Sequence, residues 1–357
     1  MHIAQMISGR GLDGTSRYCQ LITRALVDRG HQVTLFHRPE AWIAANVDAS
    51  AVQRVETTFE RSFREIRRVR SLIRALSPDV IQTHYSSANT FGMFMHWAGA
   101  GRVATGHACN FHPAWFLADR LIAPTEEVAR YHNAVNRIPR KRITLIPNFI
   151  EVAPVLPDRS AKRAAIRSEL GIDDDAVVVG MVGSIVPRKR QQDLVRALVL
   201  ARSRAPNLKL VLTGSFHDAG IVGELNRIVA SGGIQQHVSV RVAEADMAAF
   251  MAALDIYAFS SNFEAGPLSI LEAMAAELPV VTTDIGAARL FVAEGETGEI
   301  VPREAIHALA RAIADLALDP QRRRRYGEAG RRRVAAHFSL GAAAARIEEV
   351  LAAAART

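Results

Sequence analysis

The sequence has few cysteines and no long apolar run. Its 357 residues include only Cys19 and Cys109, and neither has a partner at the spacing of a metal site or a redox motif. A reducing cytosol is therefore the expected compartment. No apolar run approaches the length of a membrane span, and a strand-like segment begins at His2 in place of a basic and apolar leader. We expect a protein that is neither secreted nor membrane-spanning by itself.

Clusters of carboxylates and histidines at metal-ligand spacing are also missing. The one acidic run, Asp173 to Asp175, precedes the strand expected at 176–182, so it lies at the amino end of that strand and reads as a turn. Ligands of open parallel sheets bind beyond the carboxyl ends of the strands. We therefore predict no metal site, no metal requirement and no bound cofactor.

The positive charge is confined to the first part of the chain. Residues 1–150 contain 19 Lys and Arg against 11 Asp and Glu, whereas residues 151–357 contain 25 of each. Six of these arginines lie between Arg61 and Arg74, beside apolar residues at helical spacing, so residues 59–76 are expected to form a basic amphipathic helix. This helix is either an ordinary surface helix or a contact for anionic lipid or an anionic acceptor. Nucleic acid is not expected as a partner, because no recognition motif is present.

Strand-like and helical runs alternate along the whole chain, which is typical of parallel sheets wound with helices on both faces. Three prolines between Pro147 and Pro157 interrupt the alternation and predict a linker. The expected strands lie near 2–7, 32–36, 79–83, 102–106, 120–123 and 142–145 before the linker, and near 176–182, 208–213, 237–241, 255–259 and 279–282 after it. The expected fold class is α/β, with two doubly wound Rossmann-like domains facing across a cleft.

A glycine-rich turn follows the first strand. Gly9, Gly11 and Gly14 match the spacing of the dinucleotide fingerprint. That fingerprint also needs an acidic residue after the second strand to hold a ribose, but His37 and Arg38 stand there. A nicotinamide cofactor is therefore disfavoured, and Gly11 and Gly14 are predicted to let the loop approach a substrate closely.

The most informative segment is residues 262–275, in which eight positions separate Glu264 from Glu272. It follows a predicted strand and enters a helix expected from about Pro267 to Glu277. Backbone amides at a helix N-terminus bind phosphate oxygens, and carboxylates accept hydrogen bonds from vicinal hydroxyls. This combination suits a nucleotide sugar, with Glu272 placed to hold the ribose. The predicted contacts of this turn are Ala265, Gly266, Pro267, Leu268 and Ser269.

The loop after the strand at 176–182 supplies cations. It contains Gly183, Ser184, Arg188 and Lys189, and cations at a helix start are unfavourable unless an anion lies between them and the helix. We therefore assign Arg188 and Lys189 to a diphosphate.

These motifs, with the Leu278–Thr282 strand and the Asp284–Gly286 and Glu296–Pro302 segments, resemble the retaining family-4 glycosyltransferases of GT-B fold over nearly the whole chain. Lys189 occupies the family's lysine position, whereas Ser184 replaces its arginine and Arg190 its second glycine. Glu277 stands where the family usually has glycine, so we expect a changed helix C-cap. The resemblance implies an acceptor-side domain at 1–150, a nucleotide-sugar-binding domain at 151–338, and a helix at 339–357 that packs back on the first domain.

The resemblance also implies roles for residues outside these segments. His107 matches the histidine that contacts the donor sugar, Asn148 matches another family position, and His84 ends its strand where an acceptor is expected. His112 is a weaker candidate of the same kind. The loop that reads the base corresponds to Arg241, Val242 and Ala243. The implied catalytic residues are His107, Arg188, Lys189 and Glu264.

The sequence thus predicts a cytoplasmic retaining glycosyltransferase that moves a sugar from a UDP- or GDP-sugar to a glycan or lipid-linked acceptor. Bacterial envelope polysaccharide or lipopolysaccharide synthesis at the inner face of the plasma membrane is the expected setting. Two alternatives stay open: a nucleotide-sugar epimerase of the same fold, which would need its own carboxylates in the first domain, and a non-catalytic nucleotide-sugar or glycan-binding protein, which would be expected to lose Glu264, Lys189 or His107.

Overall fold

The computed structural model describes residues 1–95, 99–112, 115–152, 158–215, 219–241 and 247–355. Contacts within the chain divide it into two compact units, one formed by Met1–Glu151 with Phe338–Thr357, the other by Val152–His337. Each unit is built around one parallel sheet. No helix among the described residues is long and apolar enough to cross a membrane.

The first unit has a seven-stranded parallel sheet in the order β3-β2-β1-β4-β5-β6-β7. Its strands are β1 (His2–Ile7), β2 (Gln32–His37), β3 (Val52–Glu56), β4 (Val80–His84), β5 (Gly101–Thr105), β6 (Arg120–Ala123) and β7 (Ile143–Leu145). Its helices are α1 (Gly14–Asp28), α2 (Trp42–Ala45), α3 (Phe63–Leu76), α4 (Ser86–Met93), α5 (Glu126–Ala134) and α14 (Leu340–Ala355), with short 3₁₀ turns at Trp115–Leu117 and Arg140–Arg142.

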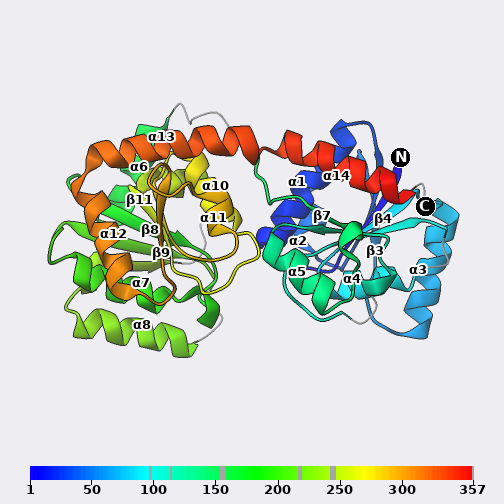
Figure 1. Cartoon of the computed structure of the whole chain (residues 1–357), viewed down its shortest axis with the longest axis horizontal. Coiled ribbons are helices and arrows are strands. Elements are labelled where there is room, and N and C mark those ends of the chain that lie inside the picture. The colour runs from blue at the N-terminus through cyan, green and yellow to red at the C-terminus, as the bar shows by residue number, and fades with distance from the viewer. Residues whose placement is uncertain (96–98, 113–114, 153–157, 216–218, 242–246, 356–357) are drawn as a thin grey trace. The chain divides into compact units, whose positions relative to one another are not determined.

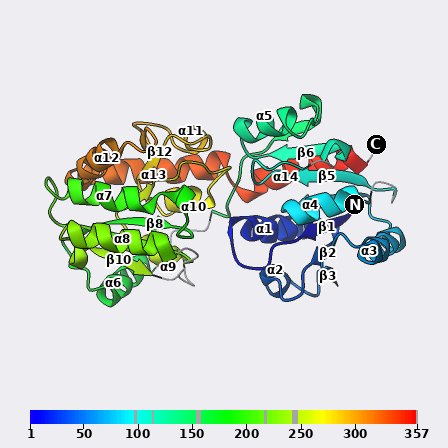
Figure 2. The same ribbon diagram turned by 90° about the horizontal axis from the view of Figure 1, so that it is seen from below.

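Helices cover both faces of this sheet. Helices α1 and α14 share one buried cluster with the strands, and α3 and α4 share another. The C-terminal helix α14 lies beside β5 and β6 (Figure 2). It comes so close to β5 that a Cβ atom on Gly101 would lie 2.3 Å from the Ala354 carbonyl oxygen, so the packing requires glycine there.

The second unit has a six-stranded parallel sheet in the order β10-β9-β8-β11-β12-β13. Its strands are β8 (Val177–Val182), β9 (Leu208–Thr213), β10 (Val238–Arg241), β11 (Ile256–Phe259), β12 (Val280–Thr283) and β13 (Gly298–Val301). Its helices are α6 (Arg159–Glu169), α7 (Gln191–Ala201), α8 (Ala219–Ser231), α9 (Met247–Ala253), α10 (Leu268–Ala275), α11 (Ala288–Phe291), α12 (Ile306–Leu318) and α13 (Pro320–His337), with 3₁₀ turns at Pro187–Lys189 and Gln235–His237.

These two strand orders confirm the predicted α/β class with two Rossmann-like sheets. In each unit the order reverses beside the first strand, at the β1–β4 pair and at the β8–β11 pair. Loops that leave two such strands diverge and open a crevice, which is where doubly wound sheets bind ligands. The candidate residues should therefore be sought at the carboxyl ends of these four strands.

The C-cap of α10 keeps its hydrogen bonds although Glu277 stands where glycine was expected. The Leu278 amide donates to the Ala273 carbonyl and the Glu277 amide to that of Met274, which is the Schellman pattern. Glu277 itself has φ of 61°, a left-handed conformation, and its carboxylate pairs with Arg159 at 2.8 Å. The expected change in the C-cap of α10 therefore does not alter its hydrogen bonds. It is limited to the free energy needed to hold a residue with a Cβ atom in the left-handed conformation.

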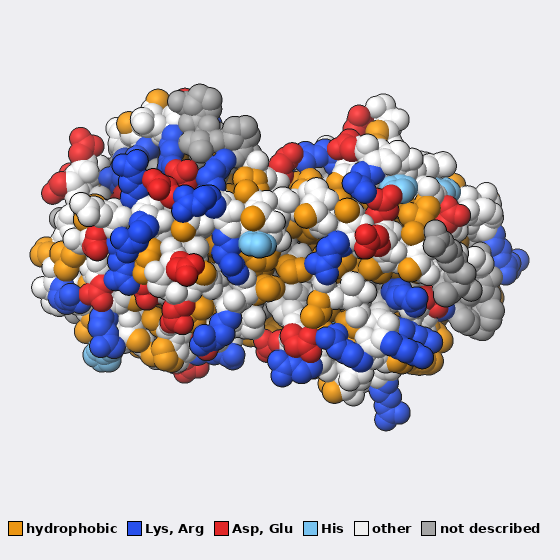
Figure 3. Space-filling model, turned by 45° about the horizontal axis from the view of Figure 1, so that its top comes forward, with side chains coloured by type: hydrophobic (Ala, Val, Ile, Leu, Met, Phe, Trp, Pro, Cys, Tyr) orange, Lys and Arg blue, Asp and Glu red, His pale blue; other side chains and the backbone are white. Residues whose placement is uncertain are grey.

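The arginines of α13 are mostly paired. Arg322 contacts Glu299 at 2.5 Å, Arg324 contacts Glu328 at 2.9 Å, and Arg323 donates to the carbonyls of Leu316 and Ala317. Figure 3 likewise shows Lys and Arg side chains interspersed with Asp and Glu on the face drawn. Carboxylates and backbone carbonyls thus balance the arginines of this helix.

Candidate functional site

In the second unit, the loops after β8 and β11 bring three predicted catalytic side chains together. Lys189 Nζ lies 3.0 Å from Glu264 Oε1, and the Arg188 guanidinium donates to the same oxygen. Lys189 follows β8 and Glu264 follows β11, and these two strands are neighbours in the sheet. A parallel-sheet switch point thus gathers residues that lie about 75 positions apart in the sequence.

The two cations differ in their surroundings. The Lys189 side chain is 10% exposed and its ammonium lies 4.9 Å from the centre of the Phe259 ring, whereas the Arg188 side chain is 52% exposed. Burial lowers the pKa of Lys189, and the neighbouring Glu264 carboxylate opposes that shift. Lys189 is therefore a cation held in a buried, low-dielectric environment, whereas the Arg188 side chain is partly in solvent and can change its conformation.

Gly183 makes room for the lysine. A Cβ atom at this position would lie 2.8 Å from Lys189 Nζ and 2.9 Å from its Cε, and the backbone has φ of 143°, which side chains rarely adopt. Both the space and the conformation therefore require glycine. The Lys189 side chain therefore packs directly against the Gly183 backbone.

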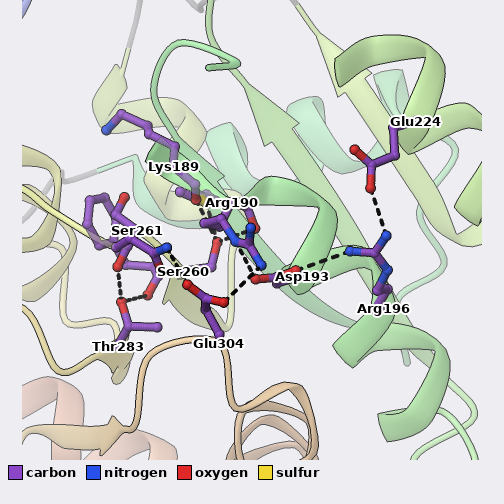
Figure 4. Close-up of polar contacts among 12 residues, drawn as sticks. Lys189, Arg190, Asp193, Arg196, Glu224, Ser260, Ser261, Thr283 and Glu304 are labelled. Carbon is purple, nitrogen blue, oxygen red and sulfur yellow. Dashed lines mark hydrogen bonds and ion pairs between the residues drawn. The ribbon is translucent and has the colours of Figure 1, made fainter. Parts of the chain in front are cut away.

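Hydrogen bonds from the neighbouring loop hold the turn that carries the cations. Ser260 Oγ donates to the carbonyls of Lys189 and Arg190 at 2.9 and 3.0 Å. Arg190, in a left-handed conformation, pairs with Asp193 at 2.7 Å, and Asp193 also pairs with Arg196 at 3.2 Å. In Figure 4 the Lys189 side chain points away from this network. The network orients the lysine without neutralising it.

Helix α10 begins beside the same cluster. Pro267 is its N-cap and the first helical residues are Leu268 and Ser269, so amides without intrahelical acceptors lie at this end. Ala265, Pro267 and Leu268 are buried, while Gly266, Ser269 and Glu272 are half-buried. The buried Tyr257 hydroxyl hydrogen-bonds Ser269 and accepts from the Val182 amide, which ties the helix to β8 and β11. The turn can hold phosphate oxygens near the two cations.

The remaining predicted residues of this unit have different surroundings. Ser184 Oγ hydrogen-bonds Ser215 Oγ at 2.8 Å, and the Ser184 carbonyl accepts from Gln191. Arg241 ends β10, its side chain pairs with Glu169, and its carbonyl accepts from the Gly214 amide. The predicted base-reading residues Val242 and Ala243 lie outside the described residues. Asp173 lies before β8 and pairs with Lys209 at 3.2 Å.

In the first unit, the two predicted histidines contact each other. His84 Nδ1 and His107 Nε2 are 3.0 Å apart, so one donates to the other. His84 is fully buried, whereas His107 is half-buried and also packs against the Tyr18 ring. Burial lowers the pKa of both, that of His107 to about 4, so both rings are neutral at pH 7. His84 therefore contacts His107 and has no solvent-exposed surface of its own.

The loop that carries His107 is fastened by a second network. His132 donates from Nε2 to the Ala108 carbonyl at 3.1 Å and accepts at Nδ1 from Asn136, whose amide also donates to the Asn110 carbonyl. The Asn136 side-chain oxygen accepts from the amide of His112, whose ring stacks on Trp115. His112 is thus buried in this loop against Trp115. Sequence reasoning missed His132 and Asn136, which carry no motif.

The glycine-rich turn after β1 is exposed at Gly11 and Gly14, and Asn148 is half-buried near the end of the unit. Asp13, between these glycines, caps α1 by accepting from the Ser16 amide at 2.8 Å. Its carboxylate also accepts from the Tyr85 hydroxyl at 2.5 Å, and Tyr85 has φ of 69°. The Asp13–Ser16 capping box was readable in the sequence. The Tyr85 contact was not, because it joins two separate strands.

One group of side chains in the described part of the chain has metal-ligand character. Cys19, His84 and His107 offer ligand atoms that all lie within 4.8 Å of one another. The acidic run at Asp173–Asp175 is not part of it. The predicted catalytic residues of the second unit are not part of it either.

Comparisons with known proteins agree with this architecture. A family model described as glycosyl transferases group 1 matches residues 162–333, and one described as glycosyltransferase family 4 matches residues 12–153. A GDP-mannose-dependent phosphatidylinositol monomannoside mannosyltransferase of Mycolicibacterium smegmatis is 30% identical over 222 residues, which cover 60% of this chain and 57% of the relative. The chain thus spans a little over half the length of that relative.

Two further similarities extend over nearly the whole chain. The lipopolysaccharide core biosynthesis glycosyltransferase LpsE of Rhizobium meliloti is 26% identical over 335 residues, which cover 91% of this chain and 92% of LpsE. Crystal structures of Anabaena HepE in complex with UDP and with UDP-glucose each superpose with a TM-score of 0.86 at 20% identity, covering 99% of this chain and 100% of HepE. The chain belongs to the family-4, or group-1, glycosyltransferases and has the GT-B fold.

Proposed function

We propose that this protein transfers a sugar from a nucleotide-sugar donor to a glycan or lipid-linked acceptor with retention at the anomeric carbon. The observation that carries the proposal is the buried Lys189, held with Arg188 against Glu264 beside the N-terminus of α10. Three sources of positive potential converge there, and a diphosphate satisfies all three. UDP- and GDP-sugars are the proposed donors. Complexes of HepE with UDP and UDP-glucose, and the GDP-mannose named for the mycobacterial relative, support this choice.

In the ground state, Arg188, Lys189 and the amides of Gly266, Leu268 and Ser269 would hold the diphosphate. Glu272, half-buried on α10 one turn beyond these amides, would accept hydrogen bonds from the ribose hydroxyls. Glu264 keeps the two cations in place before the donor binds. His107 is assigned to the donor sugar on the family resemblance.

Cleavage of the bond between the sugar and the phosphate places negative charge on the leaving diphosphate. A fixed, desolvated lysine and preoriented amides stabilise that charge more strongly than they stabilise the intact donor, which is the requirement for catalysis. The acceptor hydroxyl then attacks the oxocarbenium-like sugar from the face that the diphosphate is leaving. Its proton passes to a phosphate oxygen, so no protein base is needed.

Cations of the protein replace a metal ion in this proposal. Arg188 and Lys189 occupy the place at which a divalent ion would otherwise neutralise the diphosphate. The acidic run at Asp173–Asp175 lies before β8, at the opposite end of the strand from Lys189. We therefore propose transfer that needs neither a metal nor a cofactor.

The acceptor side is proposed to meet the inner face of the plasma membrane through residues 59–76. The helix predicted over residues 59–76 begins at Phe63. Helix α3 packs on the sheet by Val69 and Ile73, and the exposed arginines are Arg61, just before the helix, and Arg64, Arg67, Arg68 and Arg74 within it. Phe63, one of the apolar residues at helical spacing, is 81% exposed among these arginines. An aromatic ring among arginines suits the interface of an anionic bilayer. The lipopolysaccharide role named for LpsE supports an envelope acceptor.

Turnover with UDP- and GDP-sugars in the presence of candidate glycan and glycolipid acceptors tests the proposal. Nuclear magnetic resonance of the product should show the donor's anomeric configuration from the first turnover. Inverted configuration would refute the retaining mechanism. Formation of a different nucleotide sugar or of free sugar without any acceptor dependence would favour the epimerase alternative. Donor binding without turnover for every acceptor class would favour a non-catalytic binding protein.

A further inference from the structure

A thiol and two imidazoles converge inside the first unit. Cys19 lies on α1, His84 ends β4, and His107 follows β5, and their ligand atoms all lie within 4.8 Å of one another. Cys19 and His84 are buried, while His107 is half-buried and offers the way in from solvent. The proposed transfer reaction uses only His107 of the three. Cys19 and His84 are therefore chemically unexplained.

The geometry is close to that of a tetrahedral metal site. With metal–sulfur and metal–nitrogen bonds of about 2.3 and 2.0 Å, ligand atoms of such a site are separated by roughly 3.3–3.6 Å. The two imidazole nitrogens of His84 and His107, at 3.0 Å, would separate by only a few tenths of an ångström. The thiol, within 4.8 Å of both, would approach by up to roughly 1.5 Å. Rotations of the side chains cover such distances.

The same cluster contains an unsatisfied polar atom. His84 Nε2 is buried and has no hydrogen-bond partner among the described residues, and neither has the hydroxyl of Tyr18, whose ring centre lies 5.8 Å from that of His84. A buried polar atom left without a partner costs about 1–3 kcal/mol, and such atoms in native proteins call for an explanation such as an ion or water. A cation held between His84 Nδ1 and His107 Nε2 would not engage His84 Nε2, so the case for a cation rests on the geometry of the three ligand atoms.

The surroundings favour a cation. The Asp13 carboxylate accepts a hydrogen bond from the Tyr85 hydroxyl, and the Tyr85 ring centre lies 6.5 Å from that of His107. The Asp13 carboxylate acts electrostatically on Cys19 and on His107, so its negative charge lies near the cluster. A thiophilic divalent ion with one thiolate ligand would gain from that charge. Water or another group could fill its fourth position.

We propose that Cys19, His84 and His107 form an inhibitory site for a thiophilic divalent cation of the zinc type. Binding breaks the hydrogen bond between the histidines and releases the Cys19 proton to solvent as the sulfur–metal bond forms. His107 then ligates the metal and is withdrawn from the donor sugar. Metal binding depends only on the cluster, whereas the inhibition rests on the proposed function.

Cobalt(II) provides a direct spectroscopic probe of this site. Titration of the reduced, chelator-free protein should give a thiolate-to-cobalt charge-transfer band and intense visible bands of tetrahedral cobalt, saturating at one equivalent and lost when Zn²⁺ is added. Cys19→Ser and Cys19→Ala should each lose the charge-transfer band and weaken binding about a hundredfold or more, since even an outer partner of a ligand contributes 10- to 100-fold. Cys109→Ser is the matched control, because Cys109 lies two residues from His107 and outside the cluster.

Thermal unfolding of each variant separates loss of binding from loss of folding. A charge-transfer band that persists in both folded Cys19 variants, or disappears only in Cys109→Ser, would overturn the proposal, as would the absence of any tetrahedral cobalt spectrum. With a working transferase assay, Zn²⁺ should inhibit the wild type and Cys109→Ser and spare the Cys19 variants. Absence of transferase activity would leave the cobalt titration unaffected, so failure of the proposed function and failure of this site are distinguishable.

Discussion

Replacement of Lys189 by methionine isolates the charge that the proposed mechanism depends on. Methionine has nearly the same length and keeps an apolar contact with the Phe259 ring, over which the ammonium now lies at 4.9 Å. Glu264 keeps Arg188 as a partner, so no buried carboxylate is left unpaired. The Gly183 backbone beside the lysine is not crowded further, because the new side chain is no bulkier. We expect the variant to fold with wild-type secondary structure.

The expected loss is larger in turnover than in binding. A unit charge about 4 Å from the leaving group contributes up to about 4 kcal/mol at an effective dielectric constant near 20. Removing one preorganised stabilising group of this kind typically costs about 3 kcal/mol in the transition state, or a hundredfold or more in kcat. In the bound ground state the intact diphosphate is also negatively charged, but water solvates part of that charge, so the lysine contributes less to binding than to the transition state. The affinity for the diphosphate should fall by only about tenfold.

Steady-state kinetics and calorimetry with the matching nucleoside diphosphate measure the two effects separately. Lys209→Met is the control, because Lys209 is also a mostly buried lysine of this unit but pairs with Asp173 at the amino end of the sheet. It should retain wild-type kcat and affinity. A Lys189→Met variant with intact kcat and a raised KM would refute the reasoning, because the lysine would then contribute only uniform binding.

Glu272→Ala should weaken nucleoside diphosphate binding by about 1.5–3 kcal/mol, the range for hydrogen bonds to charged groups, and unchanged affinity by calorimetry would remove the ribose assignment. Transfer should survive chelator treatment, and inactivation that manganese or magnesium reverses would contradict metal independence. Burial lowers the pKa of His132 to about 4 in the folded protein, whereas the unfolded chain protonates this histidine near pH 6.5. The free energy of unfolding should therefore decrease by up to about 3 kcal/mol as the pH falls from 6.5 to 4. The decrease should be smaller in His132→Gln. The protein should sediment with anionic but not neutral vesicles at low salt, and glutamine substitutions of Arg61, Arg64, Arg67 and Arg68 should abolish the association without unfolding; equal binding to both vesicle types would contradict it.

The central strands could be predicted from the sequence almost to the residue, because apolar runs buried on both faces have a strong signal. The strands expected at 2–7, 120–123 and 208–213 coincide with β1, β6 and β9. Strands β3 and β13 were not predicted. Both lie at sheet edges, where a strand is more exposed to solvent and can contain polar residues or glycine. Their apolar pattern is therefore weaker than that of a central strand.

Side-chain partners in the site were less predictable than its location. The position of each motif after a strand placed Lys189 and Glu264 at carboxyl ends, but their contact depends on β8 and β11 being neighbours. That adjacency follows from strand order, which no local pattern encodes. His84 was expected near an acceptor because it ends β4. In the structure its ring contacts His107 and Tyr18, and the position of His84 at the end of β4 does not encode these contacts.

A ligand screen by thermal unfolding tests most directly whether the second unit holds a nucleoside diphosphate. At concentrations near a hundred times the dissociation constant, a ligand that binds only the folded state stabilises it by about 2.7 kcal/mol. UDP or GDP should raise the melting temperature of the wild type, and the rise should shrink in Lys189→Met and Glu272→Ala but not in Lys209→Met. No shift with UDP, GDP or ADP, or a shift with a nicotinamide dinucleotide instead, would contradict the account.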